Sequence, residues 1–375
     1  MNMNKRAIVC VTNDLVTDQR VHKSCIALQK VGYEVLEVGR LLPDSLPLER
    51  SYQIRRTKLF FNKGGLFYAE YNIRLFFFLL FAKVDLIFSN DLDTLPAAYF
   101  ASKIRGKEII YDSHEYFTEV PELVNRKHIQ RVWELFEKFI FPKLKRVITV
   151  NKSIADLYEK KYKNKVFVIR NIPPSYEISP IEKKSRKELG LPENKKIIII
   201  QGTGINIDRG AEEACLAMQY IDNAILLIIG KGDAFPSLKK IVSSLQLQDK
   251  IIFKDRMPSE ILRQYTMNCD LGLAIDKGTN LNYQLALPNK LFDYIHAGIP
   301  ILSTEMVELK NIIEEYQIGY FIKNHNPKDI ANTINYIFAD NITYNQKREN
   351  TVKAKQALYW EKEEDKLIAI IIKDK

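Results

Sequence analysis

The sequence predicts an α/β protein with two doubly wound parallel-sheet domains that face each other across a cleft. Its 375 residues exceed the length of one ordinary domain, and a hydrophobic content of 46% allows two sizeable cores. Short β-branched runs alternate with amphipathic stretches along the chain, and the alternation starts afresh after a polar, Pro- and Lys-rich stretch at 172–195. Apolar strands that alternate with helices are typical of parallel sheets covered on both faces.

Before that stretch, seven short apolar or β-branched runs are predicted to be strands. They lie at 7–12, 33–39, 52–59, 85–90, 108–113, 146–151 and 166–171. Amphipathic segments separate most of them and predict helices at 20–31, 66–83, 129–144 and 153–162. In such sheets ligands bind beyond the carboxyl ends of the strands, so polar motifs that directly follow strands are the candidates for function.

After that stretch, six further strands are predicted. They lie at 196–203, 224–232, 250–255, 271–276, 299–304 and 318–323. The segment "YWEKEEDKLIAIIIKDK" predicts a last amphipathic helix in which Trp360, Leu367 and Ile370 are spaced to be buried. We therefore expect a first domain, a linker and a second domain at 1–172, 173–195 and 196–358.

The net charge of +10 comes from the first half of the chain. Residues 1–170 contain 29 Lys and Arg against 19 Asp and Glu, and the remainder contains 27 of each. Such an excess favours nucleic acid, an anionic membrane surface or acidic substrates as partners. Because no nucleic-acid-binding motif accompanies it, we favour a membrane-facing patch that includes "RRTKLFFNK" (55–63). A merely solvated basic surface is the alternative.

Targeting and cysteine signals predict a cytoplasmic protein. The N-terminus has only a short apolar run, which predicts a strand and not a signal peptide. The most apolar stretch, at 75–82, is far too short to cross a bilayer. The 4 cysteines show neither CxxC pairs nor metal-ligand spacing, which indicates reduced core residues.

The segment "LALPNKLFDYIHAGIP" predicts a short helix with polar residues in its first turn. Asn289 is the expected N-cap, and Asp293 lies four residues further on the same face. A helix N-terminus attracts phosphate, and a carboxylate one turn further in can accept hydrogen bonds from a ribose diol. The segment therefore suits a nucleotide. The alternative is a structural helix in which Asp293 favours the helix dipole.

Three other strand ends in the second half add to this pattern. "GTGINIDRG" places Arg209 at the start of a helix, where a phosphate-binding cation belongs. It is not a dinucleotide fingerprint, because Ile207 stands where the third glycine would be needed. Gly230, in "IIGKGD", lets the backbone approach a ligand or simply forms a turn. Met257 follows the strand at 250–255, where a base could lodge.

In the first half, "YDSHEYF" ends a strand with Asp112, His114 and Glu115. A histidine with nearby carboxylates at a strand end can hydrogen-bond a substrate or move protons. The alternative is a loop histidine with satisfied hydrogen bonds.

A D-x-D pair, Asp91 and Asp93, follows the strand at 85–90. Such a pair could hold a divalent metal ion. No third ligand is in view in the sequence, and Asp93 is expected to be an ordinary helix N-cap. We therefore expect no metal site.

Taken together, these motifs resemble family 4 glycosyltransferases of the GT-B fold. "RG" followed by "EACLAM", "IIGKGD" and "LPNKLFDYIHAGIPIL" carry the resemblance in the second half, and "DQRVHKSCIALQKVGYEVLEV" carries it in the first. The resemblance implies two Rossmann-like domains, with the last helix (359–375) crossing back onto the first. It also implies retaining transfer from a nucleotide-sugar, without a required metal, between a donor site in the second domain and an acceptor site in the first.

By position, Asp293 matches the family's ribose ligand, and Arg209 matches the second of two phosphate-binding cations. The backbone of Asn289 and Lys290 matches the family's phosphate contacts. The first acid of the family's acid pair falls on Leu285 and the first cation falls on Thr203, so both are missing. The implied donor-binding set is Gly204, Arg209, Gly230, Met257, Leu287, Pro288, Asn289, Lys290 and Asp293.

On the acceptor side, His114 lies near the family's catalytic-histidine position, so that His114 and Arg209 are the expected catalytic residues. The glycine pair usual after the first strand is replaced by Asn13 and Asp14. The expected acceptor-side residues are Asn13, Asp14, Asp112 and Glu115.

The implied donor is a UDP- or GDP-linked sugar. We expect the acceptor to be a lipid-linked saccharide in bacterial surface polysaccharide synthesis, for example of capsule, at the inner face of the membrane. Two alternatives remain: a GT-B sugar-nucleotide epimerase, which needs no acceptor, and a nucleotide-binding protein that has lost catalysis, which the residues Leu285 and Thr203 motivate.

Overall fold

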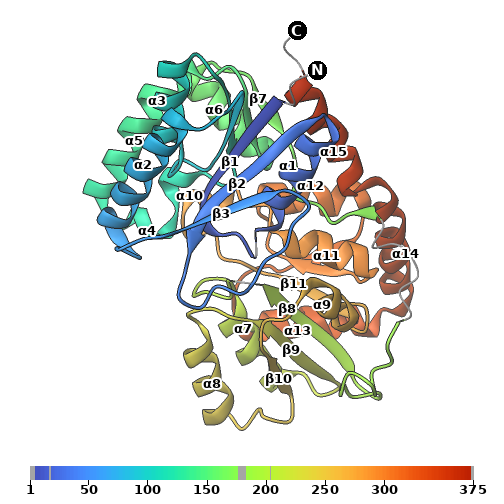
Figure 1. Cartoon of the computed structure of the whole chain (residues 1–375). Coiled ribbons are helices and arrows are strands. Elements are labelled where there is room, and N and C mark those ends of the chain that lie inside the picture. Colours follow the sequence, from blue (N-terminus) through green and yellow to red (C-terminus); the bar gives the residue numbers. More distant parts are fainter. Residues whose placement is uncertain (1–4, 17, 176–182, 203, 373–375) are drawn as a thin grey trace. The chain divides into compact units, whose positions relative to one another are not determined.

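The computed structural model describes residues 5–16, 18–175, 183–202 and 204–372, and it divides into two compact units (Figure 1). Unit 1 comprises Met1–Asn171 and Glu361–Lys375, and unit 2 comprises Ile172–Trp360. Residues 176–182 of the expected linker, and Thr203, lie outside the described residues.

Unit 1 is built on a seven-stranded sheet in the order β3-β2-β1-β4-β5-β6-β7, and all neighbouring strands are parallel. The strands are β1 (Lys5–Asp14), β2 (Tyr33–Leu41), β3 (Gln53–Lys58), β4 (Leu86–Asn90), β5 (Glu108–Ser113), β6 (Val147–Thr149) and β7 (Val166–Val168). Each coincides with a predicted strand.

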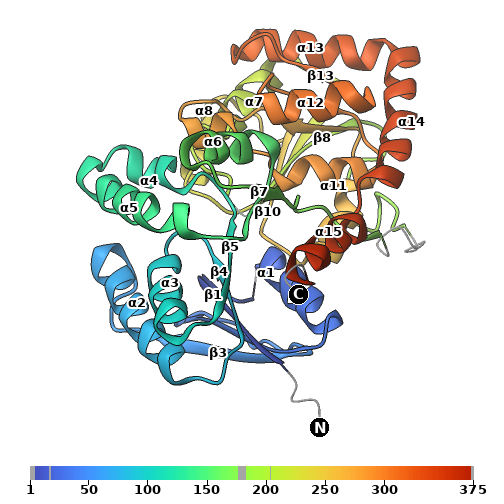
Figure 2. The same cartoon turned by 90° about the horizontal axis from the view of Figure 1, so that it is seen from above.

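Helices cover both faces of this sheet (Figure 2). They are α1 (Gln19–Lys30), α2 (Gly64–Phe81), α3 (Leu95–Arg105), α4 (Pro121–Val124), α5 (Lys127–Ile140), α6 (Lys152–Tyr162) and α15 (Trp360–Ile372). On one face, α2 and α3 bury Tyr71, Leu75 and Ala98 in a cluster with Ile8 and Cys10 of β1.

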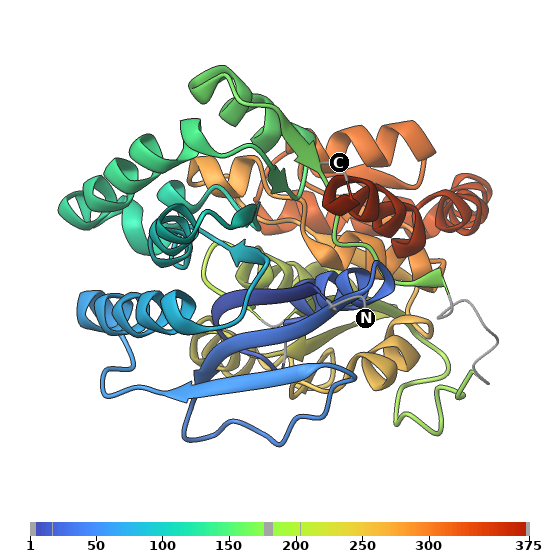
Figure 3. The ribbon, with the colours of Figure 1, turned by 45° about the horizontal axis from the view of Figure 1, so that its top comes forward.

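The last helix, α15, belongs to unit 1 although it follows unit 2 in sequence. In the three ribbon views it lies beside α1 (Figure 3). Ion pairs join Lys30 Nζ to Glu364 Oε2 at 2.6 Å and Arg170 Nη2 to Glu363 Oε1 at 2.8 Å. Its predicted core residues are buried: Trp360, Leu367 and Ile370.

Unit 2 is built on a six-stranded parallel sheet in the order β10-β9-β8-β11-β12-β13. The strands are β8 (Lys196–Gly202), β9 (Ala224–Gly230), β10 (Ile251–Lys254), β11 (Leu271–Ala274), β12 (Ile301–Ser303) and β13 (Gly319–Phe321). The four consecutive isoleucines 197–200 of β8 are all buried. Each contributes about 1.5–3 kcal/mol by burial, which makes β8 the centre of the core.

The helices of unit 2 also form two layers. They are α7 (Ala211–Ala217), α8 (Phe235–Ser244), α9 (Ser259–Thr266), α10 (Leu281–Gln284), α11 (Asn289–Ala297), α12 (Val307–Tyr316), α13 (Pro327–Ala339) and α14 (Asn341–Ala357). Helices α7, α8 and α13 pack on one face of the sheet, and α11, α12 and α14 pack on the other.

Both sheets are therefore doubly wound, as predicted. In each, the strand order reverses beside the first strand of the unit, between β1 and β4 and between β8 and β11. Such a switch point leaves a crevice at the carboxyl ends of the strands, where ligands bind in open α/β sheets. No helix among the described residues is long and apolar enough to cross a membrane.

Candidate functional site

At the switch point of unit 2, two cations share one buried carboxylate. Asp276 follows β11 and is 1% exposed. Its Oδ2 lies 2.7 Å from Lys290 Nζ, and its Oδ1 lies 3.2 Å from Arg209 Nη1. Burial raises the pKa of Asp276, but the charges of Lys290 and Arg209 outweigh burial and hold this pKa below its usual value. Asp276 is therefore a carboxylate that fixes both cations.

Arg209 is held on a second side by an aromatic ring. Its guanidinium lies over Tyr283, 4.0 Å from the ring centroid. Tyr283 is buried in α10, where Asn280 accepts a hydrogen bond from its N–H. The Arg209 side chain keeps 27% of its surface exposed. A cation held in this way is pre-oriented and still accessible to an anion.

The N-terminus of α11 differs in one respect from the sequence prediction. The N-cap is Pro288 and not Asn289, which is exposed and forms the first residue of the helix. The expectation that Asn289 caps the helix was therefore wrong. Pro288 takes the extended conformation of the cap residue, and its side chain accepts no hydrogen bond. The first N–H groups of the helix, those of Asn289 and Lys290, have no acceptor inside the helix and suit an anion.

Asp293 lies one turn further and is tied to the end of β8. Gln201 Nε2 donates to Asp293 Oδ2 at 2.9 Å, and Gln201 Oε1 accepts from Thr266 Oγ1 at 2.6 Å. Gln201 is 3% exposed, so this chain of hydrogen bonds is anchored in the core. It fixes the orientation of the Asp293 carboxylate.

The two glycines of the predicted donor set differ in what requires them. Gly230 has φ +148°, and a Cβ there would lie 1.9 Å from the carbonyl oxygen of Gly202. The protein's own packing therefore demands glycine at 230. Gly204 is exposed, and a Cβ there would meet nothing closer than Asn206 Nδ2 at 3.7 Å.

The apolar members of the predicted set lie at the border of the core under α11. Met257 and Leu287 are partly buried and pack against the cluster that contains Leu291 and Phe292. They come from the segments after β10 and before α11.

In unit 1, the ends of β4 and β5 bring His114 between acceptor oxygens. Its Nδ1 lies 3.2 Å from Asp91 Oδ2, and its Nε2 lies 3.2 Å from Asn90 Oδ1 and 3.5 Å from Asp112 Oδ2. Asn90 Nδ2 donates to Cys10 O, which turns the amide oxygen toward the ring. Both ring nitrogens therefore face acceptors, which is the environment of a doubly protonated imidazolium.

The charges around His114 also favour the doubly protonated imidazolium. Burial lowers its pKa, but the carboxylates of Asp91 and Asp112 more than offset burial and raise the pKa to about 9. Asp112 itself is held by Arg20, with bonds of 2.6 Å and 2.9 Å to its two oxygens. Burial opposes the ionised form of Asp112, yet the charges of Arg20 and His114 keep its pKa below the usual range. This environment favours a positive charge and a proton donor at His114 over a general base.

The two carboxylates of the D-x-D pair serve different partners. Asp91, at φ +57°, accepts from the His114 N–H at 2.8 Å with Oδ1. Asp93 is buried and accepts from Thr12 Oγ1, and burial together with Asp91 raises its pKa to about 7. The N-cap of α3 is Thr94, so the expectation that Asp93 caps this helix was wrong. Its side chain turns to Thr12 in the core instead.

The remaining acceptor-side candidates have local partners. Asn13 Nδ2 donates to Asp18 Oδ2 at 3.1 Å, and Asp14 accepts from Ser45 Oγ at 2.8 Å. The Glu115 carbonyl accepts from Ser113 Oγ. Among the described contacts none joins Asn13 or Asp14 to His114. Within the part of the chain that the structure describes, no group of three or more His, Cys, Asp or Glu is placed to hold a metal ion.

Sequence reasoning brought together Arg209, Lys290 and Asp293 in one unit and His114 and Asp112 in the other. It missed Asp276, Gln201, Tyr283, Arg20 and Asn90. Their position in the sequence could have indicated three of them, since Gln201, Asp276 and Asn90 lie at the end of buried strands or just after them. Leu285, where the family has its first acid, is the C-cap of α10.

Two doubly wound parallel sheets, each with charged residues gathered at its switch point, define the class of GT-B proteins. Comparison with known families agrees: residues 181–356 match the model described as "Glycosyl transferases group 1", and residues 19–172 match "Glycosyltransferase Family 4". The chain belongs to this group 1, or family 4, of glycosyltransferases.

Solved structures share the fold over nearly the full length. Sucrose-phosphate synthase from Thermosynechococcus elongatus has 17% identity and a TM-score of 0.79, with 97% of each chain covered. Anabaena HepE in complex with UDP-glucose has 14% identity and a TM-score of 0.76, with 98% of this chain and 99% of that chain covered. WaaG, a glycosyltransferase involved in lipopolysaccharide biosynthesis, has 14% identity and a TM-score of 0.78, with 98% and 100% covered. No curated protein matches the chain.

Proposed function

We propose that this glycosyltransferase moves a sugar, with retention of anomeric configuration, from a UDP- or GDP-sugar to a saccharide acceptor. The observation that carries the proposal is the arrangement of Arg209 and Lys290 around Asp276, beside the N-terminus of α11 at the switch point of unit 2. The complexes of the similar Anabaena protein with UDP and with UDP-glucose support a nucleotide-sugar as donor.

In this proposal the donor diphosphate lies against Arg209, Lys290 and the first N–H groups of α11. Negative charge grows on the leaving phosphate as the anomeric bond breaks, so donors already aimed there stabilise the transition state more than the ground state. Asp293, oriented by Gln201, accepts hydrogen bonds from the ribose diol. Gly204 would lie beside the diphosphate, and the edge formed by Met257 and Leu287 would receive the base.

The residues also suit the loss of the family's first cation. Thr203 stands where that cation is expected, and Lys290 provides a second positive charge from the first turn of α11. Because Asp276 binds both Arg209 and Lys290, it fixes the positions of the two cations relative to each other.

His114 would act in unit 1 as an imidazolium that donates hydrogen bonds to the acceptor or to the transferred sugar. It would not abstract the acceptor proton, because acceptor oxygens face both ring nitrogens and favour a proton on each. The departing phosphate is then the base, which agrees with what the family resemblance implies. No metal is required in this scheme.

We further propose that the acceptor is lipid-linked, in bacterial surface polysaccharide synthesis, and that the protein works at the inner face of the membrane. The positive charge of the first half of the chain supports an anionic membrane as partner.

The direct test incubates the protein with UDP- and GDP-sugars, with and without extracted lipid-linked saccharides. We expect slow hydrolysis with donor alone and a saccharide product of retained configuration with acceptor. An epimerised donor in the absence of acceptor would contradict transfer, and binding of nucleotide without any turnover would indicate a protein that has lost catalysis.

A further inference from the structure

Three neighbouring helices of unit 1 present apolar side chains to solvent. The exposed residues lie on one stripe of each helix: Ile73, Phe77 and Phe81 on α2; Phe100 and Ile104 on α3; Val132, Leu135 and Phe139 on α5. On α2 and α5 they lie opposite the side that is buried, which carries Leu75 and Leu79 on α2 and Trp133 on α5. We call these eight residues the α2–α3–α5 surface.

The three stripes lie on helices that pack on each other. Helix α3 packs against both α2 and α5 (Figure 2). The rings of Phe100 and Phe139 stack with centroids 6.3 Å apart, which joins α3 to α5. Arg105 Nη1 donates to Leu79 O and Ala82 O, which holds the ends of α3 and α2 together. Exposed apolar patches of this extent mark interaction sites.

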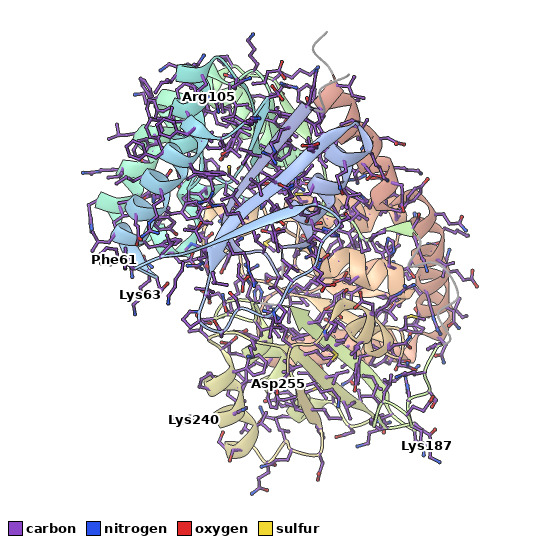
Figure 4. The ribbon with its side chains drawn as sticks, in the orientation of Figure 1. Phe61, Lys63, Arg105, Lys187, Lys240 and Asp255 are labelled. Atoms are coloured by element: carbon purple, nitrogen blue, oxygen red, sulfur yellow. The ribbon has the colours of Figure 1, made fainter. Side chains whose placement is uncertain are left out.

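Positive charge surrounds the same surface. Residues 63–83, 95–108 and 126–145 contain 12 Lys and Arg against 4 Asp and Glu, most of the net charge of the whole chain. Lys143 Nζ lies 3.0 Å from the centroid of the Phe139 ring, so apolar and cationic groups are adjacent. Lys63, at the start of α2, and Arg105, at the end of α3, are labelled in Figure 4.

The basic patch expected at 55–63 makes only part of the positively charged surface of unit 1. Arg56 donates to Leu46 O at 2.7 Å and faces Asp14, so it is used inside the protein. Arg55 stacks on the ring of Phe78 at 4.3 Å. The helices, and not the β3 segment, therefore carry the larger surface.

We infer that the α2–α3–α5 surface docks on an anionic lipid bilayer, with its apolar side chains in the interface and its cations at the lipid phosphates. A second copy of this chain is a poor occupant, because a two-fold dimer would place the same positive surface against itself. This docking surface specifies how the proposed membrane partner is bound, and it rests on the proposed function for the source of the acceptor. It does not depend on donor chemistry.

The test is sedimentation of the full-length protein with vesicles of phosphatidylcholine alone or mixed with phosphatidylglycerol, at low and high salt. We expect binding to the anionic vesicles only, weakened by salt. The apolar variant Phe81→Ser/Ile104→Ser/Leu135→Ser changes one side chain per helix, exposed by 82%, 67% and 67%. We expect it to bind at least tenfold more weakly with an unchanged melting temperature. Its matched control is Ile342→Ser, exposed by 84% on α14 of unit 2, which should bind like wild type.

The charge variant is Lys103→Glu/Lys138→Glu, and its control is Lys240→Glu on α8 (Figure 4). Because each cation near an anionic membrane contributes about a fivefold factor, we expect roughly a tenfold or greater loss for the former and little change for the latter. Equal binding to neutral vesicles, no binding by wild type, or full binding by the apolar variant would overturn the inference. Self-association abolished by the same substitutions, without lipid binding, would also overturn it.

Hydrolysis of the donor in solution separates this inference from the proposed reaction. The variants should hydrolyse nucleotide-sugar at the wild-type rate, since none of the substituted residues belongs to the proposed site. Loss of vesicle binding with intact hydrolysis supports the surface whatever the acceptor proves to be.

Discussion

Lys290 and Asp276 form a short ion pair, with Nζ 2.7 Å from Oδ2, and only 2% of the Asp276 side chain is exposed. The carboxylate sits after β11 and the lysine in the first turn of α11, so the pair fastens a helix N-terminus to a strand end. The second oxygen of Asp276 holds Arg209. One buried acid thus sets the positions of two groups that we propose to bind the donor phosphates.

Arg209→Ala and Lys290→Ala should each lower kcat by roughly a hundred- to a thousandfold, the effect of removing one preorganised donor to developing negative charge. Lys277→Ala is the matched control, because Lys277 is a neighbouring cation that pairs with Glu213 and Asp208 and not with Asp276. Steady-state kinetics measure the effect. A wild-type kcat for either variant would contradict the assigned role.

Asp276→Asn should separate position from charge. Both cations remain, so nucleoside diphosphate should bind at least as tightly as to wild type. Their fixed geometry is lost, so kcat should fall by roughly tenfold or more. Titration calorimetry and kinetics on the same preparation check this. A parallel loss of nucleotide affinity would show that Asp276 acts only through folding of the site.

Asp293→Ala should weaken donor affinity by roughly ten- to a hundredfold, since hydrogen bonds to a charged group are worth about 1.5–3 kcal/mol. The loss should appear mainly in donor KM, because ribose contacts change little in the transition state. Gln201→Ala is the control, as it breaks the same Gln201–Asp293 bond and keeps the carboxylate. Calorimetry with the nucleoside diphosphate, beside thermal melts, decides the outcome. If Asp293→Ala binds like wild type and only melts earlier, Asp293 is structural.

The charge of His114 predicts a pH dependence. Its pKa is raised from 6.5 to about 9, so the imidazolium contributes stability that is fully present below pH 6.5 and lost as pH rises through about 9. Donor turnover should fall over the same range if the imidazolium donates hydrogen bonds. His114→Gln should be slower at neutral pH and should lose this step from the pH–rate profile. A rate that rises with pH through 9 would instead indicate a general base.

Chelation should leave turnover nearly unchanged. Leaving-group charge would be met by Arg209, Lys290 and a helix N-terminus, and the carboxylates of Asp91 and Asp93 are engaged with His114 and Thr12. Assays with EDTA check this. Loss of activity that manganese restores would contradict it.

Local patterns in the sequence were enough to predict both sheets. All strands expected from β-branched runs are present, and the helix expected at 359–375 forms over Trp360–Ile372. These elements depend on periodicity and composition, which can be read within a short window. The reversal of strand order beside β1 and β8 needs the fold itself.

The candidate site was predicted less completely, for a physical reason. Asp276 is 67 residues from Arg209 in sequence, and Arg20 is 92 residues from Asp112. A charge that is buried because of such a distant partner has no local signature. The two N-cap errors, at Asn289 and Asp93, arise from the same limit: a residue type favours a cap, but tertiary contacts decide which residue occupies it.

The separation of unit 1 into two stretches of sequence affects how the chain is made. Residues 1–171 leave the ribosome first, but Lys30 and Arg170 find their partners only when Glu364 and Glu363 have been synthesised. At about 5–20 residues per second, unit 2 takes roughly 10–40 s to translate. During that interval the side of α1 that α15 covers stays open on the nascent chain.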